Sequence, residues 1–419
     1  MSLIKNSVWN LAGYVIPTAI AIPALGYLAR VLGLELFGIY TLAIAIVGYA
    51  GIFDVGLTRA IVREIALFRD EPDERKLIIS TSTIFILLFG SLGMLVIYMF
   101  IPNIVHMLNI SSLHIHEVEI SLKILVFSIP LFLLNQLWMS ILEGDEKFSI
   151  LNIQRSIGSS VIAGLPALFV WLEHSLVYAI IGLLVGRGIS FIISFVIVRG
   201  EIISAKLRFN PSTFKRLIFF GGWITVSNII SPVMVYFDRF VISNLLGAKF
   251  VSYYTAPSEA VSRLGLIPGA LSRAVYPRLS NTTNKDEFRK QLKFSYKLMM
   301  LGCLPIVIFG IVFSKNILGI WMGQEYAIHS YYILCILLIG FFFNSIAQIP
   351  FTAIQSVGKA KVTALLHCIE IIPYLCVLYY FVKWYGITGA AYAWCLRVVL
   401  DCLFLVLISN VYTNRHRGI

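Results

Sequence analysis

The chain is a series of apolar blocks, each about twenty or more residues long, separated by short charged segments. A helix of that length crosses the ~30 Å hydrocarbon core of a bilayer. Charged residues make up 13% of the chain, against roughly 25% in soluble domains, and the mean hydropathy is +0.88. A water-soluble chain of 419 residues cannot cover its surface with so few charges. The sequence therefore predicts an all-α integral membrane protein.

Twelve blocks fit a transmembrane length, and the fourth, fifth and eighth carry internal charges. The predicted spans are residues 8–29, 36–57, 77–101, 118–142, 149–172, 176–198, 215–237, 250–271, 294–320, 329–354, 360–382 and 387–410.

Lys and Arg collect on alternate sides of these spans. If the N-terminus is cytoplasmic, 23 of the 33 basic residues fall in cytoplasmic segments, five in outer segments and five inside spans. Basic residues favour the cytoplasmic side, and moving the count by one helix destroys the alternation. We therefore expect twelve spans with both termini in the cytoplasm.

The net charge of +12 does not indicate a nucleic-acid partner. The basic residues sit in short loops, and no basic segment interleaved with aromatic residues is present to grip a nucleic-acid backbone. The six cysteines lie in apolar segments without a CxxC pair, so we interpret them as small apolar side chains.

The first quarter of the chain repeats in the second half at an offset of 214 residues, without a gap. The pairs are Trp9 and Trp223, Leu32-Gly33 and Leu246-Gly247, Tyr40-Thr41 and Tyr254-Thr255, and Arg59-Ala60 and Arg273-Ala274. Two six-helix bundles of equal orientation are thus expected, residues 1–210 and 211–419, related by an axis along the membrane normal. Parallel repeats of this kind are typical of transporters.

Charged side chains lie inside several spans, where they are costly and usually face a bundle interior or a wet cavity. Glu259 and Arg263 are four residues apart on one predicted helix, as are Arg397 and Asp401. Each pair is either an intrahelical salt bridge or part of a functional site. Glu370 has no local partner, and either pairs across the bundle with Lys123, Arg155 or Arg187 or titrates. The candidates for ion coupling or charge pairing are Asp54, Glu259, Glu370, Arg397 and Asp401.

A set of arginines on or near the spans suits a pyrophosphate group, because the guanidinium presents a fork of donors to phosphoryl oxygens. The alternative for Arg59, Arg63 and Arg273 is that they only mark the cytoplasmic face. Arg263 is mid-span, where a charge has no topological use. The candidate ligands are Arg30, Arg59, Arg63, Arg187, Arg263 and Arg273.

Catalytic signatures are missing from the sequence, which contains no GxSxG, no HExxH and no GxxxxGK[ST]. We expect no catalytic residue, no cofactor and no metal site. Without an ATP-binding loop, uphill transport would draw on an ion gradient or on consumption of the cargo on the far side.

Several segments resemble bacterial O-antigen and polysaccharide flippases of the multidrug/oligosaccharidyl-lipid/polysaccharide exporter superfamily. The first runs from NSVWNLAGYV to AIVREIA at 6–66, and the second is SNIISPVMVYFDRFVISNLLGAKFVSYYTAP at 227–257. Three more follow in the family's order: WMGQEY at 321–326, IQSVGKAKV at 354–362 and YGITGAAYAWCLRVVLD at 385–401. Arg30, Asp54, Arg59 and Arg63 match the first segment, Asp238 and Arg239 the second, and Arg397 and Asp401 the last.

The resemblance implies twelve helices working by alternating access in the bacterial inner membrane. The implied cargo is an undecaprenyl-pyrophosphate-linked O-antigen or capsule repeat unit, moved from the cytoplasmic to the periplasmic leaflet. Membrane lipid, an O-antigen polymerase and a chain-length regulator are the implied partners.

Three other functions remain as alternatives. A flippase for the peptidoglycan precursor usually has two additional helices. A multidrug exporter of the same superfamily is expected to have an acidic cavity. An O-antigen polymerase, which is an enzyme, is expected to have a large periplasmic loop, whereas no predicted outer loop exceeds about twenty residues.

Overall fold

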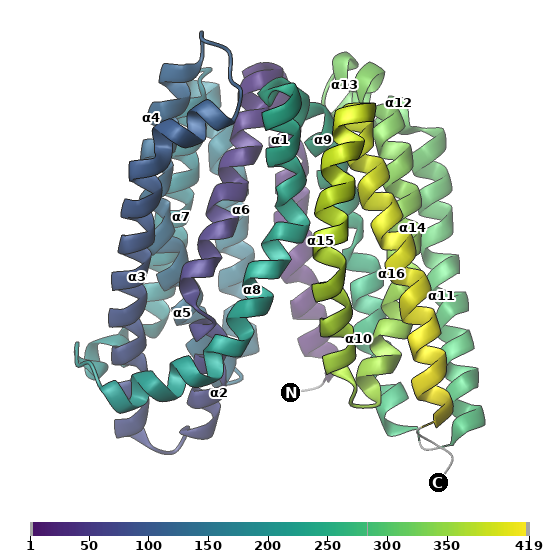
Figure 1. Cartoon of the computed structure of the whole chain (residues 1–419). Coiled ribbons are helices and arrows are strands. Elements are labelled where there is room, and N and C mark those ends of the chain that lie inside the picture. Colours follow the sequence, from purple (N-terminus) through teal and green to yellow (C-terminus); the bar gives the residue numbers. More distant parts are fainter. Residues whose placement is uncertain (1–2, 283, 416–419) are drawn as a thin grey trace. The chain divides into compact units, whose positions relative to one another are not determined.

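The computed structural model describes residues 3–282 and 284–415. The helices are α1 Leu3–Tyr49, the short 3-10 helix η1 Ala50–Asp54, α2 Leu57–Leu67, α3 Pro72–Met107, α4 Ile115–Val126, α5 Ser128–Gly144, α6 Phe148–Leu172, α7 Leu176–Ala205, α8 Pro211–Leu246, α9 Ala248–Leu264, α10 Leu266–Asn281, α11 Lys285–Val312, α12 Ser314–Trp321, α13 Gln324–His329, α14 Tyr331–Ser356, α15 Ala360–Tyr385 and α16 Ile387–Arg415 (Figure 1).

The predicted all-α membrane fold is confirmed, and within the described ranges the chain contains helices but no strand. Nine described segments are long and apolar enough to cross a membrane. One of them holds two predicted spans, because α1 is interrupted at Gly33, whose φ of 73° and ψ of 177° are not helical. Together with α8 and the pair α9–α10, which cover the predicted spans 215–237 and 250–271, this gives about twelve transmembrane helices.

The chain divides into two compact units, Met1–Phe237 and Asp238–Ile419. The division falls inside α8, so one continuous helix belongs to both units. The halves 1–210 and 211–419 are defined by the repeat rather than by compactness and stay a prediction. The side chains of the repeat pair Trp9 and Trp223 lie outside the residues whose side chains are described.

In the first unit, α6 packs along α7 and α1 along α6. Gly182 and Gly186 of α7 form a G-x-x-x-G pattern against α6. A Cβ at Gly182 would lie 2.7 Å from the carbonyl oxygen of Leu165, and one at Gly186 would lie 2.9 Å from the Cα of Ile162. Small residues at this spacing let two membrane helices approach through their backbones, so these glycines set the position of α7.

The first turns of α8 lie across one end of the first unit (Figure 1). The ring of Phe214 packs 4.9 Å from that of Phe85 on α3. Near its fourth turn α8 meets the start of α2 through backbone alone, because a Cβ at Gly56 would lie 2.1 Å from the carbonyl oxygen of Gly221. Gly56 has a φ of 69° and ends the break that separates η1 from α2. Glycine at both positions is what permits this contact.

In the second unit, α14 packs against α16, α11 and α10. Gly340 of α14 accommodates the indole of Trp394, since a Cβ there would lie 2.4 Å from the Trp394 ring. Ala347, Ile354, Cys402 and Leu405 form a buried apolar cluster between α14 and α16. The packing of α15 on α16 then brings polar residues of these two helices together.

The outward helix faces are apolar, as a lipid-facing surface requires. Exposed large side chains include Met99 on α3, Trp171 on α6 and Ile372 on α15. Inside the units, several buried hydroxyls bond back to their own helix; for example, Ser345 Oγ donates to the carbonyl of Phe341 at 2.7 Å. Such bonds satisfy a polar group where no water is available.

Candidate functional site

The second unit holds a cluster of ionisable side chains on facing helices, formed by His367 and Glu370 of α15 and Asp401 of α16. One ligand atom from each of the three lies within 4.8 Å of the others. His367 Nε2 is 3.6 Å from Asp401 Oδ1, and the His367 ring stacks on Phe351 of α14 with the ring planes 8° apart. Both carboxylate oxygens of Glu370 are buried without a hydrogen-bond partner. Among the described residues, this is the group that can hold a cation.

Arg397 adds a positive charge to the same pair of helices. It precedes Asp401 by one helical turn, and its guanidinium carbon lies 5.3 Å from the centre of the Tyr374 ring on α15. Tyr374 itself follows Glu370 by one turn. The predicted candidates Glu370, Arg397 and Asp401 thus lie together along the α15–α16 contact.

A second chain of polar contacts in this unit links α8 to α9. Asp238 accepts hydrogen bonds from the hydroxyl of Tyr254 at 2.6 Å and from the backbone N–H of Arg239 at 2.8 Å. The buried Arg239 guanidinium pairs with Glu259 at 2.8 Å. The predicted contact of Glu259 with Arg263 is present but longer, at 3.7 Å, so Glu259 lies between two arginines.

Two predicted arginines of the first unit, Arg59 and Arg63, lie on α2 and are paired with acids. Arg59 is 3.3 Å from Glu143, and Arg63 is 2.8 Å from Glu64. Glu64 is fully buried and also binds Arg216 of α8 at 2.6 Å. These contacts hold α2 against α5 and α8.

A neighbouring ion-pair group joins α3, the α5–α6 loop and α7. Arg75 donates to Asp145 at 2.7 Å and to Glu201 at 2.6 Å, and Lys147 donates to Asp145 at 2.9 Å. Burial alone would raise the pKa of the Asp145 carboxyl, but the hydrogen bonds from Arg75 and Lys147 outweigh it and hold that pKa below its usual range.

The remaining predicted residues lie at other places on the helices, except Asp54, which precedes Arg59 by only five positions. Arg30 is exposed on α1, and Arg273 is exposed on α10. Asp54 is buried in η1 and accepts from the Thr58 hydroxyl at 2.6 Å, across the break before α2. Arg187 lies on α7 with its guanidinium carbon 5.1 Å from the centre of the Phe132 ring on α5.

The sequence prediction did not include His367, Glu64 or Arg216 as site residues. His367 precedes Glu370 by three residues on one span, and that spacing places both on one helix face. Glu64 and Arg216 carry no such signal, because they meet only after α8 folds across α2.

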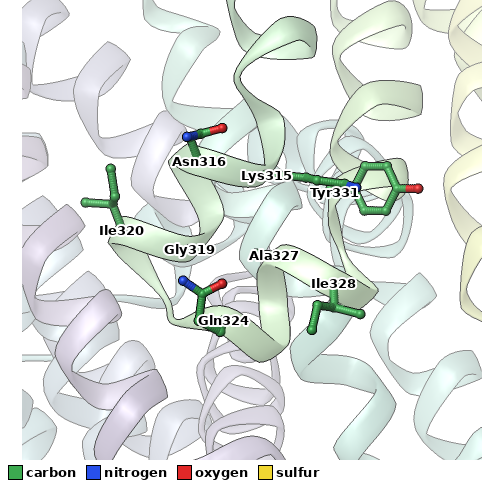
Figure 2. A pocket seen from close by; sticks show the side chains of 8 residues that line it. All are labelled: Lys315, Asn316, Gly319, Ile320, Gln324, Ala327, Ile328 and Tyr331. Carbon is green, nitrogen blue, oxygen red and sulfur yellow. The ribbon is translucent and has the colours of Figure 1, made fainter.

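A surface pocket lies away from these charges, around α12 and α13 (Figure 2). It has a volume of about 590 Å³, and its lining includes the amides of Asn316 and Gln324. The Nζ of Lys315 lies 4.4 Å from the centre of the Tyr331 ring. Lys315 is the charged residue in its lining, and none of the predicted site residues lines it.

The chain matches known proteins along most of its length. The family model described as polysaccharide biosynthesis protein matches residues 3–283, and a second model, MatE, matches residues 224–380. A Shigella flexneri protein described as "Putative O-antigen transporter" is 56% identical over 418 residues, which cover 99% of this chain and 100% of that protein.

Solved structures share the fold at low sequence identity. The lipid II flippase MurJ in an inward closed conformation has a TM-score of 0.80 at 19% identity, over 96% of this chain and 87% of MurJ. An inward-facing multidrug resistance MATE family transporter of the MOP superfamily has a TM-score of 0.78 at 14% identity, over 97% of this chain and 98% of that one. The family model covers well over half of the chain, and the Shigella flexneri relative spans nearly all of it, so the chain is a multi-pass membrane protein belonging to the polysaccharide biosynthesis protein family.

Proposed function

We propose that the protein is a flippase for a lipid-linked O-antigen repeat unit, which it carries by alternating access from the cytoplasmic to the periplasmic leaflet of the bacterial inner membrane. The observation that carries this proposal is the 56% identity to the Shigella flexneri relative over the full length of both chains. Because the match runs over 99% of this chain and 100% of the relative, we infer that the two proteins carry the same class of cargo.

The cargo is proposed to be linked through undecaprenyl pyrophosphate. Arg263 of α9 supports this, since its side chain remains 35% exposed although Glu259 is one turn away. Glu259 is also engaged by the nearly buried Arg239 at the shorter distance of 2.8 Å. Arg263 makes only the longer of the two contacts to Glu259, so its partly exposed guanidinium keeps donors that can engage an incoming phosphoryl group.

The energy source is proposed to be an ion gradient acting on the cluster of His367, Glu370 and Asp401. With an uncharged imidazole, the two carboxylates and the nearby Arg397 sum to one negative charge. An unbalanced charge inside a bilayer is costly, so binding of one proton or other monovalent cation relieves that cost. Occupied and empty forms of this unit then differ in energy, as ion coupling requires.

We also propose a topology and two partners. Both termini are proposed to lie in the cytoplasm, because basic residues of the loops collect on that side. The product, a lipid-linked unit in the outer leaflet, is the substrate of a polymerase, whose products a chain-length regulator limits. These two proteins are the proposed functional partners.

A multidrug exporter is the second candidate, favoured by the MatE model match at residues 224–380. It predicts that expression raises drug tolerance and leaves O-antigen unchanged. The surroundings of Glu259 argue for the flippase, because this acid lies between Arg239 and Arg263 and does not form the acidic cavity expected of a multidrug exporter.

The test is complementation of a strain from which this gene has been deleted. The wild-type protein should restore surface O-antigen and clear lipid-linked units that accumulate in the deletion strain. Arg263→Glu should fail at an equal expression level, while Arg263→Lys should retain part of the activity. A normal amount of surface O-antigen with Arg263→Glu would show that Arg263 does not bind the pyrophosphate. Failure of the wild-type protein to complement the deletion would overturn the proposed function itself.

A further inference from the structure

The first unit contains one deeply placed arginine that the fold leaves without an acid. Arg187 lies eleven residues after Leu176, where α7 begins, so it is about 17 Å along the helix axis, near mid-bilayer depth. Its Nε and Nη1 atoms are buried without a hydrogen-bond partner. Within the described part of the chain, no carboxylate forms an ion pair with it.

The polar groups nearest to Arg187 along α7 are already occupied by one another. The Gln154 amide nitrogen donates to Ser194 Oγ at 2.5 Å and to Ser190 Oγ at 3.2 Å. Ser194 Oγ in turn donates to Asn135 Oδ1 at 2.5 Å. The acceptors of this network between α5, α6 and α7 are hydrogen-bonded to other members of the network. They therefore do not offset the charge of the Arg187 guanidinium.

The other described neighbours of Arg187 include no acid: the phenol of Tyr40 on α1 lies close enough to interact with its charge, and the rest are apolar or backbone. Phe132 of α5 faces the guanidinium. Gly186, which precedes Arg187 on α7, packs closely on the backbone of α6. The side chain is nevertheless only partly buried as a whole, and its third nitrogen, Nη2, is not among the enclosed atoms. A ligand can therefore approach the guanidinium from one side.

We propose that Arg187 is the anchor of an anion site in the first unit, and that the anion is a phosphoryl group of the lipid-linked cargo. This inference rests on the proposed function and adds a binding residue on α7. A buried, unpaired charge destabilises a membrane protein, so the position is costly unless an anion arrives during the working cycle. A phosphoryl group fits better than a carboxylate from the protein, because two of its oxygens can engage the guanidinium fork at once.

The proposal predicts an inverse relation between stability and binding. Without an anion, Arg187→Met removes the unpaired charge while keeping much of the volume, and should raise the Tm of the protein by about 2 °C or more. When an anion is added, the Tm of the wild-type protein should rise and that of Arg187→Met should not, because only the wild-type protein can bind the anion. A purely structural arginine would behave in the opposite way.

The experiment uses full-length protein in detergent, with inorganic pyrophosphate as the probe and gluconate salts to hold the ionic strength constant. The wild-type Tm should rise saturably with pyrophosphate, and Arg187→Met should lose this rise. Arg155→Met is the matched control, since Arg155 is on the adjacent helix α6 and lies 4.0 Å from Glu143. It should keep the rise.

Three results would overturn the proposal. A lower Tm for Arg187→Met without anion would show that the side chain stabilises the fold. An undiminished pyrophosphate response in that variant would place the anion elsewhere. An equal response of the wild-type protein to chloride would indicate a halide site. None of these depends on O-antigen export, so failure here is distinguishable from failure of the proposed function.

Discussion

Gly33 and Gly247 lie 214 residues apart and have the same role in the two halves of the repeat. Both have a positive φ, 73° and 105°, and each lies where one predicted span passes into the next. Seven residues later, Tyr40 and Tyr254 are both buried. The repeat seen in the sequence therefore corresponds to a repeated backbone conformation.

Gly33→Ala should destabilise the protein although its Cβ would meet no atom within 4 Å. The cost is backbone strain, of about 1–2 kcal/mol, because an L-residue disfavours this φ. Thermal unfolding measures it. Gly302→Ala in α11 is the control, since it is helical and its Cβ also meets nothing within 4 Å. Equal Tm values for the two variants would contradict the prediction.

Glu64→Gln should be among the most destabilising single-atom changes in the first unit. The side chain is 1% exposed and binds both Arg63 and Arg216. The side chains of Arg63 and Arg216 are 48% and 38% exposed, so removal of the Glu64 charge does not leave them buried. We expect a cost of about 1–3 kcal/mol for the lost charged hydrogen bonds, measurable as a loss of Tm. Glu146→Gln provides the comparison, because Glu146 is 68% exposed and pairs only with Arg69 at 3.2 Å. It should change the free energy of unfolding by less than about 1 kcal/mol.

The contribution of Asp145 to stability should disappear in acid. Its pKa is lowered in the folded state, so the stabilisation is complete above the unfolded-state value of about 3.9 and is lost as the pH falls through the lower folded-state value. Asp145→Asn should therefore reduce Tm at pH 7, and the difference from wild type should narrow below about pH 4. A difference that is constant from pH 7 to pH 3 would assign the effect to packing.

Glu370→Gln should reduce O-antigen export at least about tenfold while the protein still folds, because the amide cannot supply the negative charge that attracts a cation. Surface O-antigen and the amount of protein in the membrane are measured together. Glu287→Gln, at an exposed position in the first turn of α11, should export normally. Full export by Glu370→Gln would exclude this carboxylate from ion coupling.

The fold class, the approximate number of spans and the repeat could be predicted because they depend on apolar length and on short local patterns. The partners of buried charges could not, because they depend on how far each helix is rotated about its axis. Glu259 illustrates both cases. Its contact with Arg263 follows from spacing along one helix, whereas its closer contact with Arg239 joins residues twenty positions apart on α8 and α9.

The partners of the basic residues near the predicted cytoplasmic face could not be predicted from the sequence either. Arg59 and Arg63 were predicted as pyrophosphate ligands or topology markers, and each lies beside an acid that the pattern of basic residues does not reveal. Arg187 was predicted as a candidate pyrophosphate ligand, without a local motif to support it. Its unpaired nitrogens become visible only when the surrounding helices are in place.

The backbone contact of α7 with α6 at Gly182 and Gly186 determines which helix can move near Arg187. Where two backbones touch, no layer of side chains can change rotamer to absorb sliding, and the two helices move as one rigid body. Phe132, which faces the guanidinium, is carried by α5 and contacts α7 through side chains. We therefore expect a displacement of α5, rather than sliding of α6 along α7, to change access to Arg187.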